Sequence, residues 1–223
     1  MSTAVLARLD RPRRLRVLGS GRGALHLDLD GFVVTIGVHG VPMMPNGIAA
    51  GRGEAPRSVA WDPAAPPTWD PVVRPPELPP DAVAALGEWL AARVAVPDVP
   101  VLVAGERLLG RGPGLTPEGD DVLAGAAAAV RALGPAAGLA PGGRDALVAA
   151  LVPPGVRRRT GALSATLLGL AAAGAAPEPV HRLIAGPGAG REGALADLSR
   201  LGASTGRAIA AGVALAARHL ARG

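Results

Sequence analysis

The pattern of apolar and polar positions changes character near residue 80. Before it, the apolar residues form short runs of strand length at Leu15–Leu18, Ala24–Leu29 and Phe32–Val38. Asp30-Gly31 between the second and third runs is a strong hairpin dipeptide. We therefore predict an antiparallel meander of two or three strands.

Glycine and proline mark the breaks in this part of the chain. The Gly-x-Gly-x-Gly run at Gly19–Gly23 resembles a phosphate-binding loop, but no helix follows it, so we interpret it as a turn. The Pro42–Pro80 segment is predicted to be mostly turns and extended chain, with one further strand at Arg57–Trp61. Trp61 and Trp69 are expected to cover a small core.

From residue 81 onward the apolar residues recur at helical spacing, and Gly or Pro stands in each gap. The first predicted helix is Asp81–Val96, with Asp81 as its N-cap. The others are Val99–Leu109, Pro117–Leu133, Arg144–Val152, Gly161–Ala173, Pro179–Ala185, Arg191–Leu201 and Thr205–Leu220. The pattern thus predicts an α+β protein, with a β-rich part over residues 1–80 and a helical part over residues 81–223.

Composition excludes several classes of chemistry. The chain has no Cys, and all 23 basic residues are Arg, so it has no thiolate, disulfide, Schiff-base lysine or P-loop lysine. Its four His show no metal-binding spacing. Three Trp and one Phe leave few platforms for stacking bases, and no apolar run reaches the roughly 20 residues of a membrane span. We expect a cytoplasmic protein of a GC-rich bacterium, without a nucleic-acid or membrane partner.

The stretch Gly110–Asp121 is the most distinctive in the chain. Its glycines and prolines predict an irregular loop that leads into a helix, with Thr116 as N-cap and Pro117 at the first helical position. A helix start presents free backbone N–H groups, which commonly bind an anion. Arg111 would add a bidentate contact to that anion.

Two adjacent carboxylates, Asp120 and Asp121, fall in the first turn of this predicted helix. Neighbouring helical side chains point about 100° apart, so the two cannot both face one small site. One of them would bind Mg²⁺ or act as a base, while the other caps a backbone group. Alternatively, both simply complement the helix dipole.

Residues 114–121 read Gly-Leu-Thr-Pro-Glu-Gly-Asp-Asp and are followed by Leu123 and Gly125. This run closely resembles the Gly-Leu-Thr-Pro-Ser-Gly-Asp-Asp signature of a family long described as being of unknown function. The described member of that family is the AllH-type subunit of oxamate carbamoyltransferase. The pattern departs from the signature at Glu118, where Ser is usual.

Shorter elements of the chain are similar to the same family. Arg159-Thr160 with Ser164 is similar to its Thr-plus-Ser segment, and Gly202–Gly206 is similar to its Gly-x-Ser-Ser-Gly turn. Pro45–Ile48 is similar to a Pro-x-x-Ile element. Ala208 stands where the family usually has Asp, so any site that uses this Asp in relatives is altered here.

The resemblance implies a subunit of a carbamoyltransferase assembly that works with other, FdrA-like subunits in allantoin and purine nitrogen catabolism. The reaction would interconvert oxalurate plus phosphate with oxamate plus carbamoyl phosphate. It needs positioning and stabilisation of an oxyanion, which backbone N–H groups and Arg supply. The sequence leaves open whether this chain is catalytic. A second interpretation is a non-catalytic subunit whose motif holds a helix junction for partner docking.

The expected site lies at the helix start after Gly114–Pro117 and takes a small anionic carbamoyl or carboxylate substrate. We expect Thr116, Asp120 and Asp121 to carry the chemistry, with Mg²⁺ at the two carboxylates and no other cofactor. Each hydroxyl is also explained by ordinary N-capping. The expected anion-binding residues are Arg111, Gly114, Gly119, Thr160, Ser164, Ser204 and Thr205.

Overall fold

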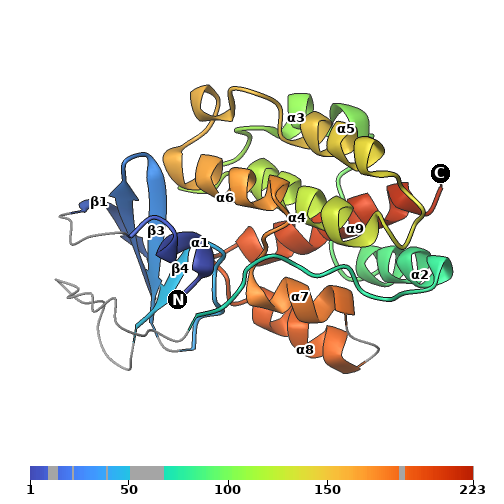
Figure 1. Ribbon diagram of the computed structural model, residues 1–223, viewed down its shortest axis with the longest axis horizontal. Helices are drawn as coiled ribbons and strands as arrows, with labels where there is room; N and C mark the ends of the chain where they lie inside the picture. Colours follow the sequence, from blue (N-terminus) through green and yellow to red (C-terminus); the bar gives the residue numbers. More distant parts are fainter. Residues whose placement is uncertain (10–14, 22, 39, 51–67, 186–188, 223) are drawn as a thin grey trace.

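The computed structural model describes residues 1–9, 15–21, 23–38, 40–50, 68–185 and 189–222. A small β-sheet lies at one end of the molecule, and a larger assembly of helices fills the rest (Figure 1). The predicted α+β fold, with an N-terminal sheet followed by a helical part, is confirmed. The predicted strand at Arg57–Trp61 lies outside the described residues.

The sheet has four strands in the order β1-β2-β3-β4. Strands β1 (Arg16–Gly21), β2 (Ala24–Leu29) and β3 (Phe32–Gly37) form the predicted antiparallel meander, and β4 (Gly47–Ala49) pairs in parallel with β3. Asp30 and Gly31 turn the β2–β3 hairpin with φ values of 51° and 83°, the left-handed geometry that such two-residue turns require. The predicted turn at Gly19–Gly23 is wrong in part, because its first three residues continue β1.

Strand β3 is buried on both faces and joins the two parts of the molecule. On one face, Val34 and Ile36 pack in a small core with Met1 and Val5, the latter from helix α1 (Thr3–Leu6). On the other face, Val33 packs against helix α6 (Ala162–Ala172). The Val33 N–H also donates a 3.0 Å hydrogen bond to the Thr166 hydroxyl of α6, which fixes the sheet against the helices.

Two long helices, α4 (Glu118–Leu133) and α9 (Thr205–Leu220), form the centre of the helical part (Figure 1). Their backbones touch at two glycines. A Cβ at Gly125 would lie 2.1 Å from the Ile209 carbonyl oxygen, and one at Gly212 would lie 2.0 Å from the Val122 carbonyl oxygen. Only glycine allows the two helices to cross so closely. This crossing fixes where the N-terminal ends of α4 and α9 meet.

The remaining helices cover this central pair and the core around it. Each predicted helix is present, although α2 ends at Ala91 rather than at Val96. The short elements α1, β4 and η1 (Val156–Arg158) were not predicted. The surrounding helices are α2 (Pro80–Ala91), α3 (Val101–Leu108), α5 (Pro141–Leu151), α6, α7 (Glu178–Ala185) and α8 (Ala189–Leu198).

Two predicted N-caps are wrong. Pro79 occupies the N-cap of α2, and Asp81 is exposed in its first turn. Pro117, not Thr116, occupies the N-cap of α4. In both cases the N-cap residue is a proline, whose side chain has no hydrogen-bond acceptor, so the helix begins without a side-chain cap. The Thr116 hydroxyl is consequently available for another contact.

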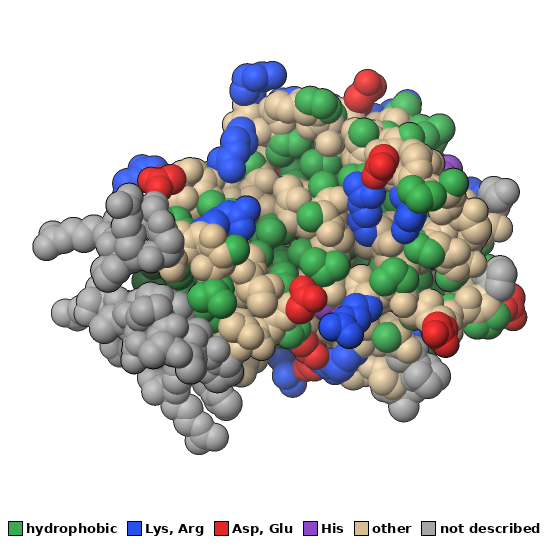
Figure 2. Space-filling view, in the orientation of Figure 1, with side chains coloured by type: hydrophobic (Ala, Val, Ile, Leu, Met, Phe, Trp, Pro, Cys, Tyr) green, Lys and Arg blue, Asp and Glu red, His purple; other side chains and the backbone are tan. Residues whose placement is uncertain are grey.

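The outer surface of the helical part mixes charges of both signs. On the face shown in Figure 2, Arg, Asp and Glu side chains are scattered among apolar groups and backbone. Among the residues that the structure describes, no helix combines the length and the apolar character needed to cross a membrane.

Candidate functional site

A cavity of about 760 Å³ lies between the sheet and the helical part. One wall comes from β2, β3, β4 and the segment 41–44 that precedes β4. The opposite wall comes from residues 113–116, from Leu163 and Leu167 of α6, and from residues 200–205 at the start of α9. Its volume lies in the range of small-molecule sites.

The two family-like segments meet in the wall of this cavity. The Thr116 hydroxyl lies 3.2 Å from the Thr205 hydroxyl, although 89 positions separate them in the chain. Gly114 and Ser204 also line the cavity. Gly114 has a φ of 97°, a backbone conformation that favours glycine and lets the loop turn along the cavity. Of the predicted site residues, Gly114, Thr116, Ser204 and Thr205 are therefore brought together.

Asp120 is buried and links the loop to the start of α6 through hydrogen bonds, and it does not line the cavity. Its Oδ1 accepts a 2.6 Å hydrogen bond from the Gly110 N–H, and its Oδ2 accepts one from the Thr160 hydroxyl. Of the two predicted roles for the adjacent carboxylates, Asp120 takes that of capping a backbone group. Thr160 takes part in the same hydrogen-bonded link and does not line the cavity.

Asp121 is buried as deeply, with 3% of its surface exposed, but its Oδ2 makes no hydrogen bond. Burial raises the pKa of Asp121 to about 7. The hydroxyls of Thr205 and Thr116 lower this pKa in part, whereas the charges of Asp120 and Glu118 raise it further. Asp121 therefore lies behind the two cavity-lining threonines as a carboxyl group that changes protonation near neutral pH.

A second, much smaller cavity of about 20 Å³ adjoins Asp121. Gly125, Ile209 and Met44 are among its other lining residues, so it lies where α4, α9 and the segment before β4 meet. A space of this size holds one water molecule. Such a water would give the unpartnered Asp121 oxygen a partner without admitting a larger ligand.

The start of α4 is closed by its own loop. The Gly119 N–H donates a 2.9 Å hydrogen bond to the Arg111 carbonyl oxygen, and a Cβ on Gly119 would lie 2.1 Å from the Leu108 carbonyl oxygen. Gly119 thus allows the loop to pack on the helix. The Arg111 side chain is exposed and does not line the cavity. An anion at this helix start stays a prediction, and the cavity opens elsewhere.

The start of α9 opens into the cavity at Ser204 and Thr205, with Arg207 behind these lining residues. Ser204 occupies its N-cap but makes no side-chain cap hydrogen bond. The Gly206 N–H bonds to the Leu201 carbonyl oxygen, whereas the backbone N–H groups of Thr205 and Arg207 have no hydrogen-bond partner among the described residues. Two unpaired N–H groups at the positive end of a helix favour an anionic ligand.

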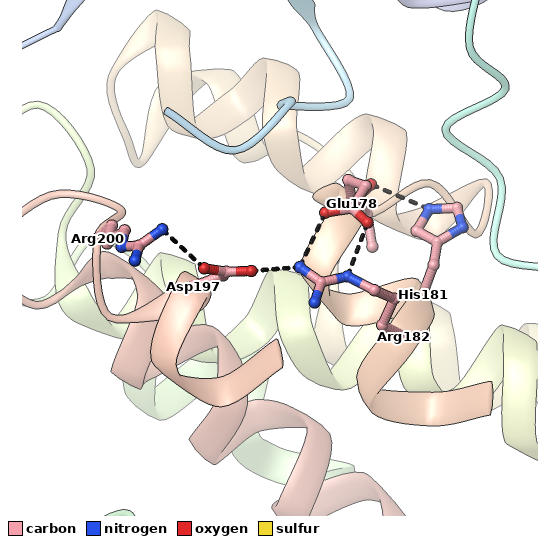
Figure 3. Close-up of polar contacts among 6 residues, drawn as sticks. Glu178, His181, Arg182, Asp197 and Arg200 are labelled. Carbon is pink, nitrogen blue, oxygen red and sulfur yellow. Dashed lines mark hydrogen bonds and ion pairs between the residues drawn. The ribbon is translucent and has the colours of Figure 1, made fainter. Parts of the chain in front are cut away.

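Arg200 lies at the rim of the cavity, at the end of a row of charged side chains (Figure 3). Its guanidinium lies 2.9 Å from Asp197, which lies 2.5 Å from Arg182, which in turn pairs with Glu178 at 2.8 Å. Hydrogen bonds to Glu178 and Asp197 raise the pKa of Arg182 above its ordinary value. The row is too exposed to add much stability, but it orients Arg200.

The sheet contributes a hydrogen-bonded chain, of which the sequence singled out only the segment Pro45–Ile48 that contains Asn46. The fully buried Asn46 donates from Nδ2 to the Val33 carbonyl oxygen and to the Thr35 hydroxyl, both at 2.9 Å. The same hydroxyl lies 3.0 Å from His26 Nδ1. His26 and Thr35 line the cavity, and burial lowers the pKa of His26.

The remaining predicted residues lie away from the cavity. Ser164 is buried in α6, its hydroxyl makes no hydrogen bond, and it does not line the cavity. Ala208 is also buried, so the position where the family usually has Asp faces the protein interior. Sequence reasoning missed Arg200, although this residue comes just before the Gly202–Gly206 turn; that proximity was the available signal.

The acidic residues do not form a magnesium site. Within the described ranges, no group of three His, Asp or Glu residues lies close enough together to hold a metal ion. Both oxygens of Asp120 accept hydrogen bonds from the protein, and Asp121 adjoins only a water-sized space. Mg²⁺ keeps several water ligands and uses one or two carboxylates, so this donor set does not fit it.

Comparison with known proteins places the helical part in a family. No curated protein and no solved structure matches the chain. Residues 108–217 match the family model described as oxamate carbamoyltransferase subunit AllH. The matched span includes α4, α6, most of α9 and both segments that meet in the cavity, whereas the sheet lies outside it. The resemblance seen in the sequence is thereby confirmed over residues 108–217, which match the AllH family of oxamate carbamoyltransferase subunits.

Proposed function

We propose that this chain binds the small anionic substrate of an oxamate-carbamoyltransferase-like assembly in the cavity between the start of α9 and the sheet. The observation that carries the proposal is the meeting of Thr116 and Thr205 in the cavity wall, beside the unpaired N–H groups at the start of α9. The two segments belong to the matched span, so two family-like segments face one cavity.

The chemistry of this wall suits a carboxylate or a phosphate. The N–H groups of Thr205 and Arg207 would donate to its oxygens, as helix starts do for phosphate groups in other proteins. The guanidinium of Arg200, oriented by Asp197, would add a charge-assisted contact from the rim. This assignment moves the anion from the predicted start of α4, which the loop carbonyl of Arg111 closes, to the start of α9.

Asp121 has the properties of the general base in this proposal. In carbamoyl transfer, the amide nitrogen of oxamate attacks the carbonyl carbon of carbamoyl phosphate. A bond from this nitrogen to the carbonyl carbon forms, and the carbon–oxygen bond to phosphate breaks with its electron pair. The proton lost by the nitrogen would pass through the hydroxyl of Thr116 or Thr205 to ionised Asp121. A pKa near 7 lets Asp121 accept and return that proton at neutral pH.

A second candidate function is that of a non-catalytic subunit whose motif supports partner docking. The observation in its favour is that Asp120, Thr160 and Gly119 are used to hold the loop together rather than to line the cavity. In both candidates the partners are other carbamoyltransferase subunits of the FdrA-like kind. The two functions differ in whether this chain binds a small anion by itself.

Thermal unfolding with oxamate, carbamoyl phosphate or inorganic phosphate separates the two candidates. A ligand at 100 times its Kd stabilises the folded state by about 2.7 kcal/mol, which is roughly 5–10 °C for a chain of this size. We expect this shift in the unmodified chain and its loss in Arg200→Gln. Arg93→Gln is the matched control, because Arg93 also pairs with an exposed carboxylate, Glu192, but lies away from the cavity. If none of the ligands produces a shift, the docking function is favoured.

A further inference from the structure

The wall opposite the start of α9 holds a chain of three hydrogen-bonded side chains that the proposed function does not use. It runs from buried Asn46 through Thr35 to His26, and its last two members line the cavity. All three residues precede the span that matches the family. What this wall recognises therefore follows from its own geometry.

The hydrogen bonds of this chain favour one tautomer of His26. Thr35 accepts the N–H of Asn46 Nδ2 on its hydroxyl oxygen, which leaves it one proton to donate. Among the described residues, His26 Nδ1 is the acceptor within reach of that proton. We infer that Nδ1 accepts this proton, which places the remaining proton of the neutral ring on Nε2; Nε2 has no hydrogen-bond partner among the described residues.

The other end of the chain is held rigidly. Asn46 is fully buried, and its second donated hydrogen bond goes to the Val33 carbonyl oxygen. Val33 is in turn bonded through its N–H to Thr166 of α6. The orientation of the His26 ring is thus set by the contact that joins the sheet to the helices. Burial lowers the pKa of His26, which keeps the ring neutral at neutral pH.

We propose that His26 recognises the uncharged end of the substrate, by donating a hydrogen bond from Nε2 to the carbamoyl oxygen, while the start of α9 holds the charged end. This inference rests on the proposed function and deepens it. A neutral donor suits an uncharged carbonyl oxygen, whereas the opposite wall has the backbone N–H groups and the arginine that suit an anion. The cavity would then bind a carbamoyl compound more tightly than a simple anion.

Calorimetric titration with two probes tests this assignment. Carbamoyl phosphate carries both ends, whereas inorganic phosphate lacks the carbamoyl group. In His26→Ala we expect the affinity for carbamoyl phosphate to fall about tenfold, the effect of one hydrogen bond, and the affinity for phosphate to stay unchanged. His219→Ala is the matched control, because His219 is a partly buried histidine with a lowered pKa that does not line the cavity.

Two substitutions at Thr35 test the chain behind His26. Thr35→Ser keeps the hydroxyl and should keep the preference for carbamoyl phosphate. Thr35→Val removes the hydroxyl, so His26 Nδ1 loses its partner and the preference should fall. Nitrogen NMR of the histidine ring reports the same change as a loss of the pure Nε2–H tautomer, and it does so without any ligand.

The outcomes separate this inference from the proposed function. If the unmodified chain binds neither probe, the proposed function and the inference that rests on it both fail. If it binds both probes and His26→Ala weakens them equally, or weakens neither, the proposed function stands and the role of His26 is refuted. An Nδ1–H tautomer in the unmodified chain would also refute it.

Discussion

Replacing Asp121 by Asn should stabilise the protein relative to the unmodified chain as the pH rises. Asp121 has a pKa of 3.8 when unfolded and about 7 when folded, because burial disfavours its charge. The folded state therefore binds the proton more tightly than the unfolded state. Between these two pKa values, stability falls as pH rises, and above about pH 7 the full cost of the buried charge is present. An asparagine at this position carries no charge, so the variant is not destabilised in this way at high pH.

The size of the effect follows from the two pKa values. A shift of about three units corresponds to about 4 kcal/mol at high pH, since each unit is worth about 1.4 kcal/mol. At pH 5 the cost is already about 1.7 kcal/mol, and between pH 5 and pH 8 it grows by a further amount of about 2–3 kcal/mol. The amide of Asn adds a donor that needs a partner, which costs about 1–3 kcal/mol at every pH. The change of the difference with pH, rather than its absolute value, is therefore the quantity to measure.

Urea unfolding at pH 5 and pH 8, followed by circular dichroism, measures this quantity. We expect the free energy of unfolding of Asp121→Asn, relative to the unmodified chain, to rise by about 2–3 kcal/mol from pH 5 to pH 8. Asp120→Asn, at the adjacent position, is the control. Asp120 accepts hydrogen bonds on both oxygens, so its variant should be less stable than the unmodified chain at both pH values. A pH-independent difference for Asp121→Asn, or the same behaviour in the two variants, would refute the reasoning.

Two substitutions, Gly125→Ala and Thr166→Val, test how the site is held in place, and Gly169→Ala is the comparison for the first. Each is measured by urea unfolding. Gly125→Ala should cost about 3 kcal/mol or more, because its Cβ would lie 2.1 Å from the Ile209 carbonyl oxygen; a neutral result would contradict the close crossing of α4 and α9. Gly169→Ala, at an exposed position of α6 with open space around it, should instead stabilise by up to about 1 kcal/mol. Thr166→Val leaves the buried Val33 N–H without its acceptor and should cost about 1–3 kcal/mol; no loss would mean that the sheet does not depend on this contact.

Local chemistry made much of the fold predictable. The Asp30-Gly31 turn is strong because both residues adopt left-handed backbone geometry there, and the helical spacing from residue 81 onward placed each α-helix that the structure describes in that part. The three-residue strand β4 was missed because its existence depends on a parallel partner, β3, rather than on its own pattern. The predicted caps at Asp81 and Thr116 failed because a neighbouring proline took each N-cap position.

The candidate site was predictable only in part. The motif identified the region, and the sequence suggested that one of the two aspartates would cap a backbone group and the other would not. It did not show which, because the answer depends on the Gly110 N–H and the Thr160 hydroxyl, which the fold brings to Asp120. His26 was missed for the same reason, since its partner Thr35 lies on the neighbouring strand.

The central claim is that a small anion binds at the start of α9, across the cavity from the sheet. A crystal structure of the chain grown with oxamate tests it most directly. We predict that the carboxylate of oxamate lies within hydrogen-bonding distance of the backbone N–H groups at the start of α9. Oxamate bound instead at the start of α4 beside Arg111, with the cavity empty, would contradict the account.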